Sequence, residues 1–413
     1  METEIEKKIR EILKTVKEKK LYPEIKIIEE GTASSSEFKI NGKKFLSFAS
    51  SNFLGLANSK EIKESIIEGL YQYGISQVAP YHTCGTLEIH KKLEKEISDF
   101  LNMEDAMIFN TSTMANMGVI PALVNLPSLT FFSFIKIPFK NREEAVLFSD
   151  EFNHATIIEG CRLAKGEKIV YKHCDMNDLE NKLKKYKMKK RKLILSDGVF
   201  SMDGDIAPLK DIVFLARKYG AMVFIDDACA TGILGENGRG TMEYYGLKSE
   251  VDVIVTTFSK AIGMIGGVAC ASKEIIDYLR ISAKTRMFSV AFPGALVLGV
   301  LKALEIIKKD KERRRKLWEN TKYFKTKLQE AGFNTLNSQT PIIPVLIGNE
   351  NTAIRISNEL FDRGIFCPTI YWPAVPKGKA RFRFIVSSEH TKDQMDRLIE
   401  NLVDLGKKYK IIK

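Results

Sequence analysis

A lysine and an aspartate each follow an apolar run in this sequence. Lys260 lies shortly after the run at 251–255, and Asp226 ends the run that begins at Ala221. A lysine at the end of a buried strand can form an imine with a carbonyl group, and an aspartate can keep a pyridine nitrogen protonated. Together the two residues are typical of proteins that hold pyridoxal 5′-phosphate (PLP), and we predict that cofactor.

The elements around these residues alternate as in a parallel sheet. Strands are predicted at 192–196, 221–226 and 252–257, with helices near 208–219 and 241–247 between them. This alternation is typical of an α/β protein, whose ligands bind just beyond the strand ends. We therefore expect the chemistry at that edge of the sheet.

A further apolar strand, at 106–109, leads into a helix through Ser112 and Thr113. The start of a helix presents free backbone N–H groups, which suit the phosphate of a cofactor. An ordinary helix cap explains the same residues equally well, so both interpretations stay open.

The pattern of the chain changes near residue 293. We expect a long charged helix at 295–332, strands at 341–347 and 381–386, and helices at 352–363 and 391–408. We therefore divide the chain into an N-terminal helix and arm (1–47), a PLP-binding large domain (48–293) and a smaller C-terminal α+β domain (294–413).

Composition indicates a soluble globular protein, and we expect it in the cytoplasm. Of 413 residues, 44% are hydrophobic, which is enough for a sizeable core. Residues 1–20 are densely charged and lack the apolar stretch of a secretory signal. The six cysteines show neither a C-x-x-C pair nor zinc-site spacing, so we expect free thiols and no metal site.

The net charge of +12 favours an anionic partner. Basic runs at 184–192 and 313–315 contain no interleaved aromatic residues, and no nucleic-acid-binding motif is present, so we do not expect nucleic acid. A phosphate-bearing small molecule such as an acyl-coenzyme A fits better.

The most apolar stretch lies at 123–139, but it contains Pro127, Lys136 and Pro138 and is too short and broken to span a bilayer. One interpretation is a loop packed on the protein. The other is a flap that touches a membrane or a second subunit, with the membrane contact at 124–140.

Several ordered motifs resemble those of the α-oxoamine synthase family of PLP-dependent enzymes. The resemblance covers nearly the whole chain from about Leu21 and rests on segments 52–56, 85–90, 153–155, 196–209, 226–240, 257–260 and 375–378. It implies fold type I, the aminotransferase-like fold, with a mostly parallel sheet in the large domain and a smaller C-terminal α+β domain.

The resemblance also implies a reaction and partners. A small amino acid (serine, glycine or alanine) condenses with an acyl thioester and loses CO2, which gives an α-oxoamine and a free thiol. The thioester carrier is coenzyme A or an acyl carrier protein, and the enzyme is a homodimer. The opening of the chain and the stretch at 317–347 resemble members that use serine or glycine, which makes those two the favoured amino acids.

Roles of single residues are carried over by position. Lys260, Asp226 and His154 are the implied catalytic residues, with His154 stacked on the cofactor ring. Arg383 pairs with the substrate carboxylate, assisted by Asn52. The implied cofactor-binding residues are Lys260, Asp226, His154, Ser112, Thr113, Met114, Ser201, Cys229, Thr257 and Ser289.

The sequence departs from the family pattern close to the implied site. Cys229 stands in place of a histidine, Tyr81 in place of an arginine, Thr113 in place of a glycine and Val290 in place of a hydroxyl residue. Residues 125–144 form an insertion. Either Cys229 merely fills the space of the histidine, or the pocket is rebuilt around it with Tyr81 or His82 as the donor; we favour the rebuilt pocket.

Other chemistry stays open at this point. A fold type I aminotransferase or lyase would share Lys260 and Asp226. A weakly active subunit of a heteromeric synthase would account for the lost histidine, although Lys260 speaks against it.

Overall fold

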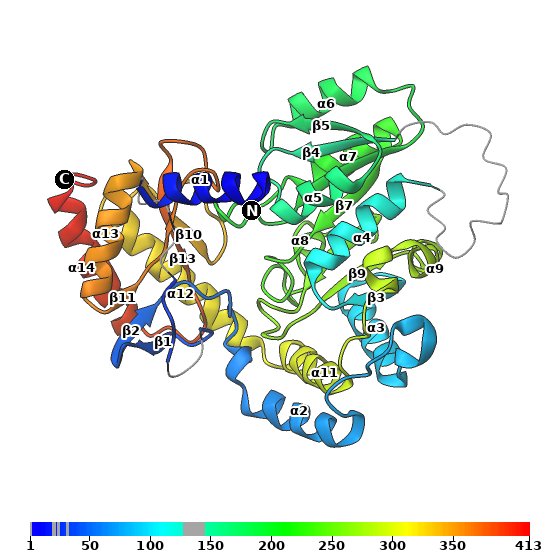
Figure 1. The fold of residues 1–413 in the computed structure, drawn as a ribbon, viewed down its shortest axis with the longest axis horizontal. Helices are drawn as coiled ribbons and strands as arrows, with labels where there is room; N and C mark the ends of the chain where they lie inside the picture. The colour runs from blue at the N-terminus through cyan, green and yellow to red at the C-terminus, as the bar shows by residue number, and fades with distance from the viewer. Residues whose placement is uncertain (1, 19–21, 23–24, 30–32, 127–144) are drawn as a thin grey trace.

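The structure is a computed structural model that describes residues 2–18, 22, 25–29, 33–126 and 145–413 (Figure 1). The expected insertion at 125–144 and most of the flap at 123–139, including the membrane contact at 124–140, lie outside the described residues. Those expectations remain predictions.

A seven-stranded sheet forms the centre of the larger part of the molecule (Figure 1). Its order is β3-β9-β8-β7-β6-β4-β5; β9 runs antiparallel to both its neighbours, and the pairs from β8 to β5 are parallel. The strands are β3 (Asp105–Phe109), β4 (Val146–Asp150), β5 (Glu167–Tyr171), β6 (Lys192–Asp197), β7 (Met222–Asp226), β8 (Val253–Thr257) and β9 (Gly267–Ala271). The predicted mostly parallel sheet is confirmed.

Helices cover both faces of this sheet, which explains why strands such as β4, β6 and β8 are buried along their whole length. Leu147, Leu195 and Val255 face one layer of helices, and Phe148 and Ile194 face the other. The helices of this part are α3 (Glu88–Leu101), α4 (Ser112–Val124), α5 (Ala155–Leu163), α6 (Met176–Lys185), α7 (Leu209–Tyr219), α8 (Thr241–Tyr244), α9 (Lys273–Ser282) and α10 (Lys284–Met287).

The sheet brings candidate residues together at one edge. Asp226 closes β7 and lies in register with Asp197, the last residue of β6, while Lys260 follows β8 by three residues. Asp150 closes β4 at the same edge. The parallel strands therefore deliver three carboxyl groups and the lysine to one place, as expected for an α/β sheet.

The elements after residue 310 form a separate α+β arrangement at the other side of the molecule, whereas the helix at 294–309 packs beside α3 in the larger part (Figure 1). The elements from residue 294 onward are α11 (Gly294–Lys309), α12 (Lys311–Glu330), β10 (Ile342–Gly348), α13 (Glu350–Asp362), β11 (Ile365–Phe366), β12 (Thr369–Ile370), β13 (Ala380–Ile385) and α14 (Lys392–Lys408). The single long helix expected at 295–332 is wrong: it is broken at Asp310. The Asp310 carboxylate accepts the backbone N–H groups of Glu312 and Arg313 and so starts a new helix.

The N-terminal arm pairs with this C-terminal part. β1 (Glu37–Ile40) and β2 (Lys43–Ser47) form a hairpin, and β2 pairs with β11 in parallel. Before them, α1 (Glu4–Glu18) has no buried residue. After them come η1 (Leu56–Asn58), α2 (Lys60–Tyr73), which packs along α11, and a π-helical turn, η2 (Tyr81–Gly85). The domain boundaries themselves remain a prediction.

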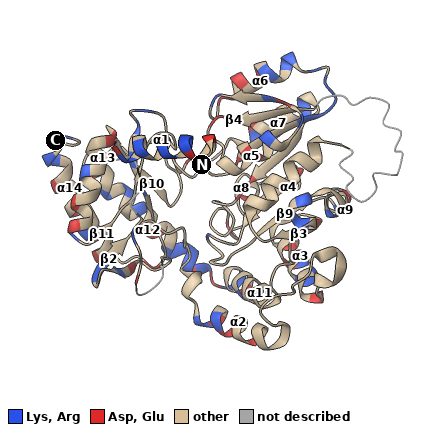
Figure 2. Cartoon of the chain, viewed as in Figure 1, with Lys and Arg blue, Asp and Glu red and all other residues tan. Residues whose placement is uncertain are grey.

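Lysine and arginine are spread over both parts of the molecule (Figure 2). The basic run at 184–192 connects the end of α6 to the start of β6, away from the edge that holds Lys260. In the described part of the chain, every helix is too short or too polar to cross a bilayer.

Candidate active site

Lys260 and Cys229 lie side by side at the centre of the site. The Lys260 ammonium group donates a hydrogen bond to Cys229 Sγ at 2.8 Å. Cys229 is only 4% exposed, and burial raises the pKa of its thiol. The cysteine is therefore a neutral hydrogen-bond partner of the lysine amine.

Asp226 is fixed by two hydrogen bonds. Asn116 Nδ2, from α4, donates to Asp226 Oδ2 at 2.6 Å, and the backbone N–H of Ala228 donates to Oδ1 at 3.1 Å. The same amide nitrogen of Asn116 donates to Thr156 Oγ1 at 2.8 Å. Asn116 was missed by sequence reasoning, although a buried amide within a helix of small apolar residues was a usable signal.

His154 caps α5 and remains accessible at the mouth of the site. Its backbone N–H donates to Asp197 Oδ2 at 2.7 Å, and its Nδ1 lies 2.8 Å from Thr156 Oγ1. Partial desolvation lowers the pKa of His154, against the pull of Asp226. The neutral imidazole that results can lie flat against an aromatic ring.

Asp197 is a second carboxyl group that sequence reasoning did not single out. Burial, followed by the charge of Asp226, raises its pKa well above the ordinary value. Asp197 also accepts a hydrogen bond from the backbone N–H of His154. Its position at the end of β6, one strand from Asp226, was the available signal.

Arg383 points from β13 toward the same site. Its Nη1 donates a hydrogen bond to the backbone oxygen of Ser201 at 3.3 Å. Burial lowers the pKa of this arginine below its ordinary value. Arg383 is therefore not on the solvent face of its strand, the alternative that its Arg-Phe-Arg-Phe context allowed.

The start of α4 provides an anion site. Thr111 caps the helix by accepting the backbone N–H of Met114 at 3.1 Å, so Ser112 and Thr113 form its first turn. A Cβ atom at Gly267 would lie 2.3 Å from Ser112 N, so only glycine lets these backbones approach. Nearby, Thr257 Oγ1 lies 2.8 Å from Ser259 Oγ. These groups suit the phosphate of PLP.

Two other expected residues have mainly structural contacts. Asn52 is buried; its Nδ2 donates to Ser34 O at 3.0 Å and its Oδ1 accepts from Ala57 N at 3.2 Å. Both ends of this amide are thus engaged by the backbone. Ser289 precedes Val290, whose carbonyl accepts from Asn110 Nδ2 at 3.0 Å, close to the start of α4.

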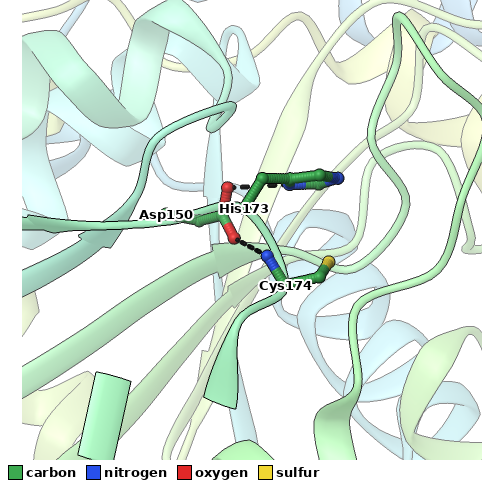
Figure 3. Close-up of side chains that lie close together, drawn as sticks. All are labelled: Asp150, His173 and Cys174. Atoms are coloured by element: carbon green, nitrogen blue, oxygen red, sulfur yellow. Dashed lines mark hydrogen bonds and ion pairs between the residues drawn. The ribbon is translucent and has the colours of Figure 1, made fainter. Parts of the chain in front are cut away.

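Side chains of the kinds that bind metals gather in one cluster at the end of β4 and just after β5 (Figure 3). Asp150, His173 and Cys174 have side-chain atoms within 4.8 Å of one another. Both ring nitrogens of His173 contact carboxylates, at 3.0 Å from Asp150 and 2.8 Å from Asp205. The cluster is therefore better described as an ion pair than as a metal site.

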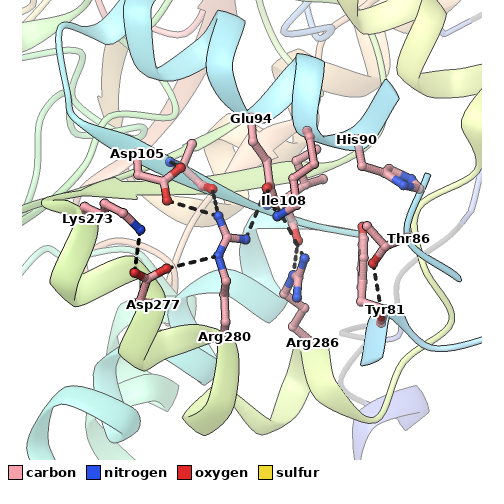
Figure 4. A network of polar contacts seen from close by, with 12 residues as sticks. Tyr81, Thr86, His90, Glu94, Asp105, Ile108, Lys273, Asp277, Arg280 and Arg286 are labelled. Carbon is pink, nitrogen blue, oxygen red and sulfur yellow. Dashed lines mark hydrogen bonds and ion pairs between the residues drawn. The ribbon is translucent and has the colours of Figure 1, made fainter. Parts of the chain in front are cut away.

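Tyr81 belongs to a different polar network, between α3, α10 and η2 (Figure 4). Its hydroxyl accepts the backbone N–H of Phe292 at 3.0 Å, and the Arg286 guanidinium lies 3.7 Å from its ring centre. His82 Nε2 lies 2.8 Å from Arg280 O. Both side chains suggested as substitutes for the missing histidine are thus engaged elsewhere, which removes support for that suggestion.

The residues present fit PLP. Lys260 offers an amine, Asp226 a carboxylate held by Asn116, His154 a flat ring and α4 an anion site. His154 also lies close enough to Asp226, Lys260 and Arg383 for their charges to act on its imidazole. Such a set on a mostly parallel sheet defines a PLP-dependent enzyme of fold type I.

Comparison with known proteins agrees with this class. The family model described as "Aminotransferase class I and II" matches residues 43–402, and the chain belongs to that family. It is 41% identical over 405 residues to 8-amino-7-oxononanoate synthase of Thermoanaerobacter pseudethanolicus, which covers 98% of each chain. It is 39% identical over 400 residues to 8-amino-7-oxononanoate synthase 1 of Bacillus subtilis, which covers 97% of each.

Solved structures give the same result. The serine palmitoyltransferase of Sphingomonas wittichii superimposes with a TM-score of 0.89 at 26% identity and covers 100% of this chain and 99% of its own. A serine palmitoyltransferase from S. paucimobilis, solved with PLP bound, has a TM-score of 0.87 at 27% identity and covers 98% of each chain. The resemblance to the α-oxoamine synthases is confirmed. The chain is a PLP-dependent acyltransferase that condenses a small amino acid with an acyl thioester and releases CO2 and a free thiol.

Proposed function

We propose that this enzyme condenses alanine with a pimeloyl thioester to form 8-amino-7-oxononanoate. The observation that carries the proposal is the 39–41% identity, along nearly the whole chain, to several 8-amino-7-oxononanoate synthases. Alanine thus replaces serine and glycine as the favoured amino acid. The acyl carrier is coenzyme A or an acyl carrier protein, and the positive net charge of +12 suits either anionic carrier.

Bound PLP would supply an electron sink for the carbon atom that loses its proton. Lys260 would bind the carbonyl carbon of the cofactor and, once released, its Nζ would take up and return the substrate Cα proton. The hydrogen bond to Cys229 orients this amine toward the site. Asp226, held by Asn116, would keep the ring nitrogen protonated.

Other side chains would position the cofactor. His154 would cover one face of the ring. Ser112, Thr113 and Thr257 would hold the phosphate, with Ser289 reaching it from a second subunit. The remaining contacts with the cofactor would come from Met114, Ser201 and Cys229.

Arg383 would bind the carboxylate of the amino acid. A planar guanidinium can donate two parallel hydrogen bonds, which fixes the direction of the substrate better than an ammonium group does. Its contact with Ser201 O holds the side chain in the site. We propose an assisting role for Asn52 through the loop that its backbone contacts stabilise.

We also propose a homodimer in the cytoplasm. Phe288 and Val290, next to the start of α4, are 63% and 44% exposed in the single chain. Apolar side chains that border a site in this way are suited to contact with a second subunit. A contact with a membrane through 124–140 remains a further proposal.

The proposal is tested by measuring free thiol release by the purified enzyme. Alanine, glycine and serine are each combined with acetyl, pimeloyl and palmitoyl thioesters of coenzyme A and of acyl carrier protein. We expect the highest kcat/KM for alanine with a pimeloyl thioester, and no turnover by the matched control Lys260→Ala. Equal or higher kcat/KM for serine with palmitoyl-coenzyme A would contradict the substrate assignment.

A further inference from the structure

His173 joins two loops that border the proposed site. It lies just after β5, and its Nδ1 is 3.0 Å from Asp150 Oδ1 (Figure 3). Its Nε2 is 2.8 Å from Asp205 Oδ2. Asp150 ends β4, and Asp205 lies in the loop that follows β6. These two carboxylates are separated by more than fifty positions in sequence, and the His173 ring contacts both of them.

The ring is held by packing as well as by charge. Phe152 stacks on it at 4.5 Å between ring centres, and Phe200 contacts it edge-on at 4.4 Å. Because Phe152 and Phe200 belong to the same two loops, apolar and ionic contacts act together. The His173 side chain is 17% exposed, so water has little access to the bridge.

The bridge requires a positively charged ring. A carboxylate accepts hydrogen bonds, and a neutral imidazole can donate only one, so contact with two carboxylates needs both nitrogens protonated. Burial lowers the pKa of His173, but the hydrogen bonds to Asp150 and Asp205 outweigh it and raise the pKa to about 12. Cys174, the other titratable group in contact, has its pKa raised by burial and stays neutral.

Each loop carries a residue of the proposed site. Asp150 also accepts a hydrogen bond from the backbone N–H of Phe152 at 2.9 Å. This bond fixes the start of the loop that leads to His154. The other loop presents Ser201, whose carbonyl accepts from Arg383. A shift of either loop would therefore move the histidine that covers the cofactor or the arginine that binds the amino acid.

We propose that His173 is a positioning residue. Its imidazolium ion holds two loops at a fixed separation: the loop at 151–154, which carries His154, and the loop at 198–208, which carries Ser201. The assignment rests on the proposed roles of His154 and Arg383. It concerns how these groups are placed, because both ring nitrogens of His173 are engaged by the carboxylates of Asp150 and Asp205.

The test compares His173→Gln with wild type in the full-length enzyme. Glutamine keeps one hydrogen bond but has no charge. We expect a PLP dissociation constant, measured by fluorescence quenching, that is about tenfold higher, and an amino-acid KM that rises about tenfold while the thioester KM changes less than twofold. A tenfold change corresponds to about 1.4 kcal/mol.

Asp205→Asn provides a second variant that removes the charge from the other end of the bridge. We expect the same two effects, and the double variant should be little worse than either single one, because both remove one interaction. If the fold-changes of the two single variants multiply in the double variant, the two residues act independently and the proposed bridge is wrong. The matched control is Glu359→Gln, which breaks the contacts of one carboxylate with Lys408 and Tyr409 far from the site.

Two results would overturn the proposal. The first is a lower Tm of His173→Gln with unchanged PLP affinity and unchanged ratio of the two KM values, which would make the residue merely structural. The second is stoichiometric zinc in the purified enzyme that is lost in Cys174→Ser, because a metal on this cluster would replace the ion pair. The PLP measurement needs no substrate, so failure of the alanine assignment would not be confused with failure of this one.

Discussion

The amide nitrogen of Asn116 lies 2.6 Å from Asp226 Oδ2, which links α4 directly to the end of β7. The helix whose first turn offers the anion site thus also fixes the carboxylate proposed to face the cofactor ring. One rigid element sets the distance between the two ends of the PLP site. Among the described residues, Asn116 Oδ1 is buried and has no hydrogen-bond partner.

This link predicts the behaviour of Asp226→Asn and Asn116→Ala. The neutral amide in Asp226→Asn cannot stabilise a charged pyridinium, so we expect retained PLP but a loss of about 10²-fold or more in Cα-proton exchange. Asn116→Ala leaves the charge but frees the carboxylate, and we expect a loss of about tenfold. Exchange of deuterium into alanine, followed by NMR, measures both. Wild-type exchange by Asp226→Asn would assign the role to another acid.

Arg383→Lys should affect one substrate more than the other. Loss of a bidentate charged contact costs about 2 kcal/mol, which corresponds to a rise of about 30-fold in the amino-acid KM. The thioester KM should change little. Steady-state kinetics with each substrate varied in turn gives the comparison, and an equal rise in both constants would reassign Arg383 to packing.

The sequence was sufficient for the sheet and for the residues at its strand ends. Lys260 and Asp226 were predictable because buried parallel strands are continuous apolar runs, and their ends must meet at one edge. The link from Asn116 to Asp226 was not predictable, since it depends on how far α4 reaches over the sheet. The break at Asp310 was missed because a charged helix and a capped junction of two helices have the same composition.

The assembly can be tested by light scattering. We expect a homodimer at micromolar concentration, with an obligate interface larger than about 2,000 Å². Phe288→Asp should weaken it, because the variant would bury a charge where the exposed ring now lies, and PLP should be lost together with the dimer. Phe214→Asp, on an exposed position of α7, is the matched control. An active monomer would contradict the proposed dimer.

His390 should make folding sensitive to acid. This buried ring accepts from Ser387 N at 3.0 Å and contacts Ser47 O at 3.0 Å, and burial lowers its pKa from 6.5 to about 4. The folded state therefore binds the proton less tightly than the unfolded state. Its contribution to stability is complete above pH 6.5, declines as the pH falls below 6.5, and is lost by about pH 4.

Between pH 7 and pH 5 the shifted pKa of His390 lowers the free energy of unfolding by about 2 kcal/mol. His390→Gln removes the titration, so the difference in unfolding free energy between pH 7 and pH 5 should be smaller by that amount than in wild type. Urea unfolding at both pH values measures it, with His82→Gln as the control at an exposed histidine. Identical pH dependence in wild type and His390→Gln would exclude the effect.

Substitutions at Cys229 distinguish two interpretations: the cysteine merely fills the space of the family histidine, or the pocket is rebuilt around the smaller side chain. The thiol already contacts Lys260 Nζ at 2.8 Å, and the residue is 4% exposed, so an imidazole at this position must displace the lysine amine or its surroundings. Overfilling of a packed site costs about 1–3 kcal/mol. We therefore expect Cys229→His to bind PLP at least about tenfold more weakly and to turn over more slowly, which is the outcome of a rebuilt pocket.

Two comparisons complete this test. Cys229→Ser keeps the size and a hydrogen-bonding group and should stay close to wild type, whereas Cys229→Ala loses the partner of the Lys260 amine and should lower kcat with little change in either KM. A histidine variant that is faster than wild type would show that the thiol only fills the space of a missing donor. An alanine variant with wild-type kcat would show that the contact between Cys229 and Lys260 has no part in the reaction.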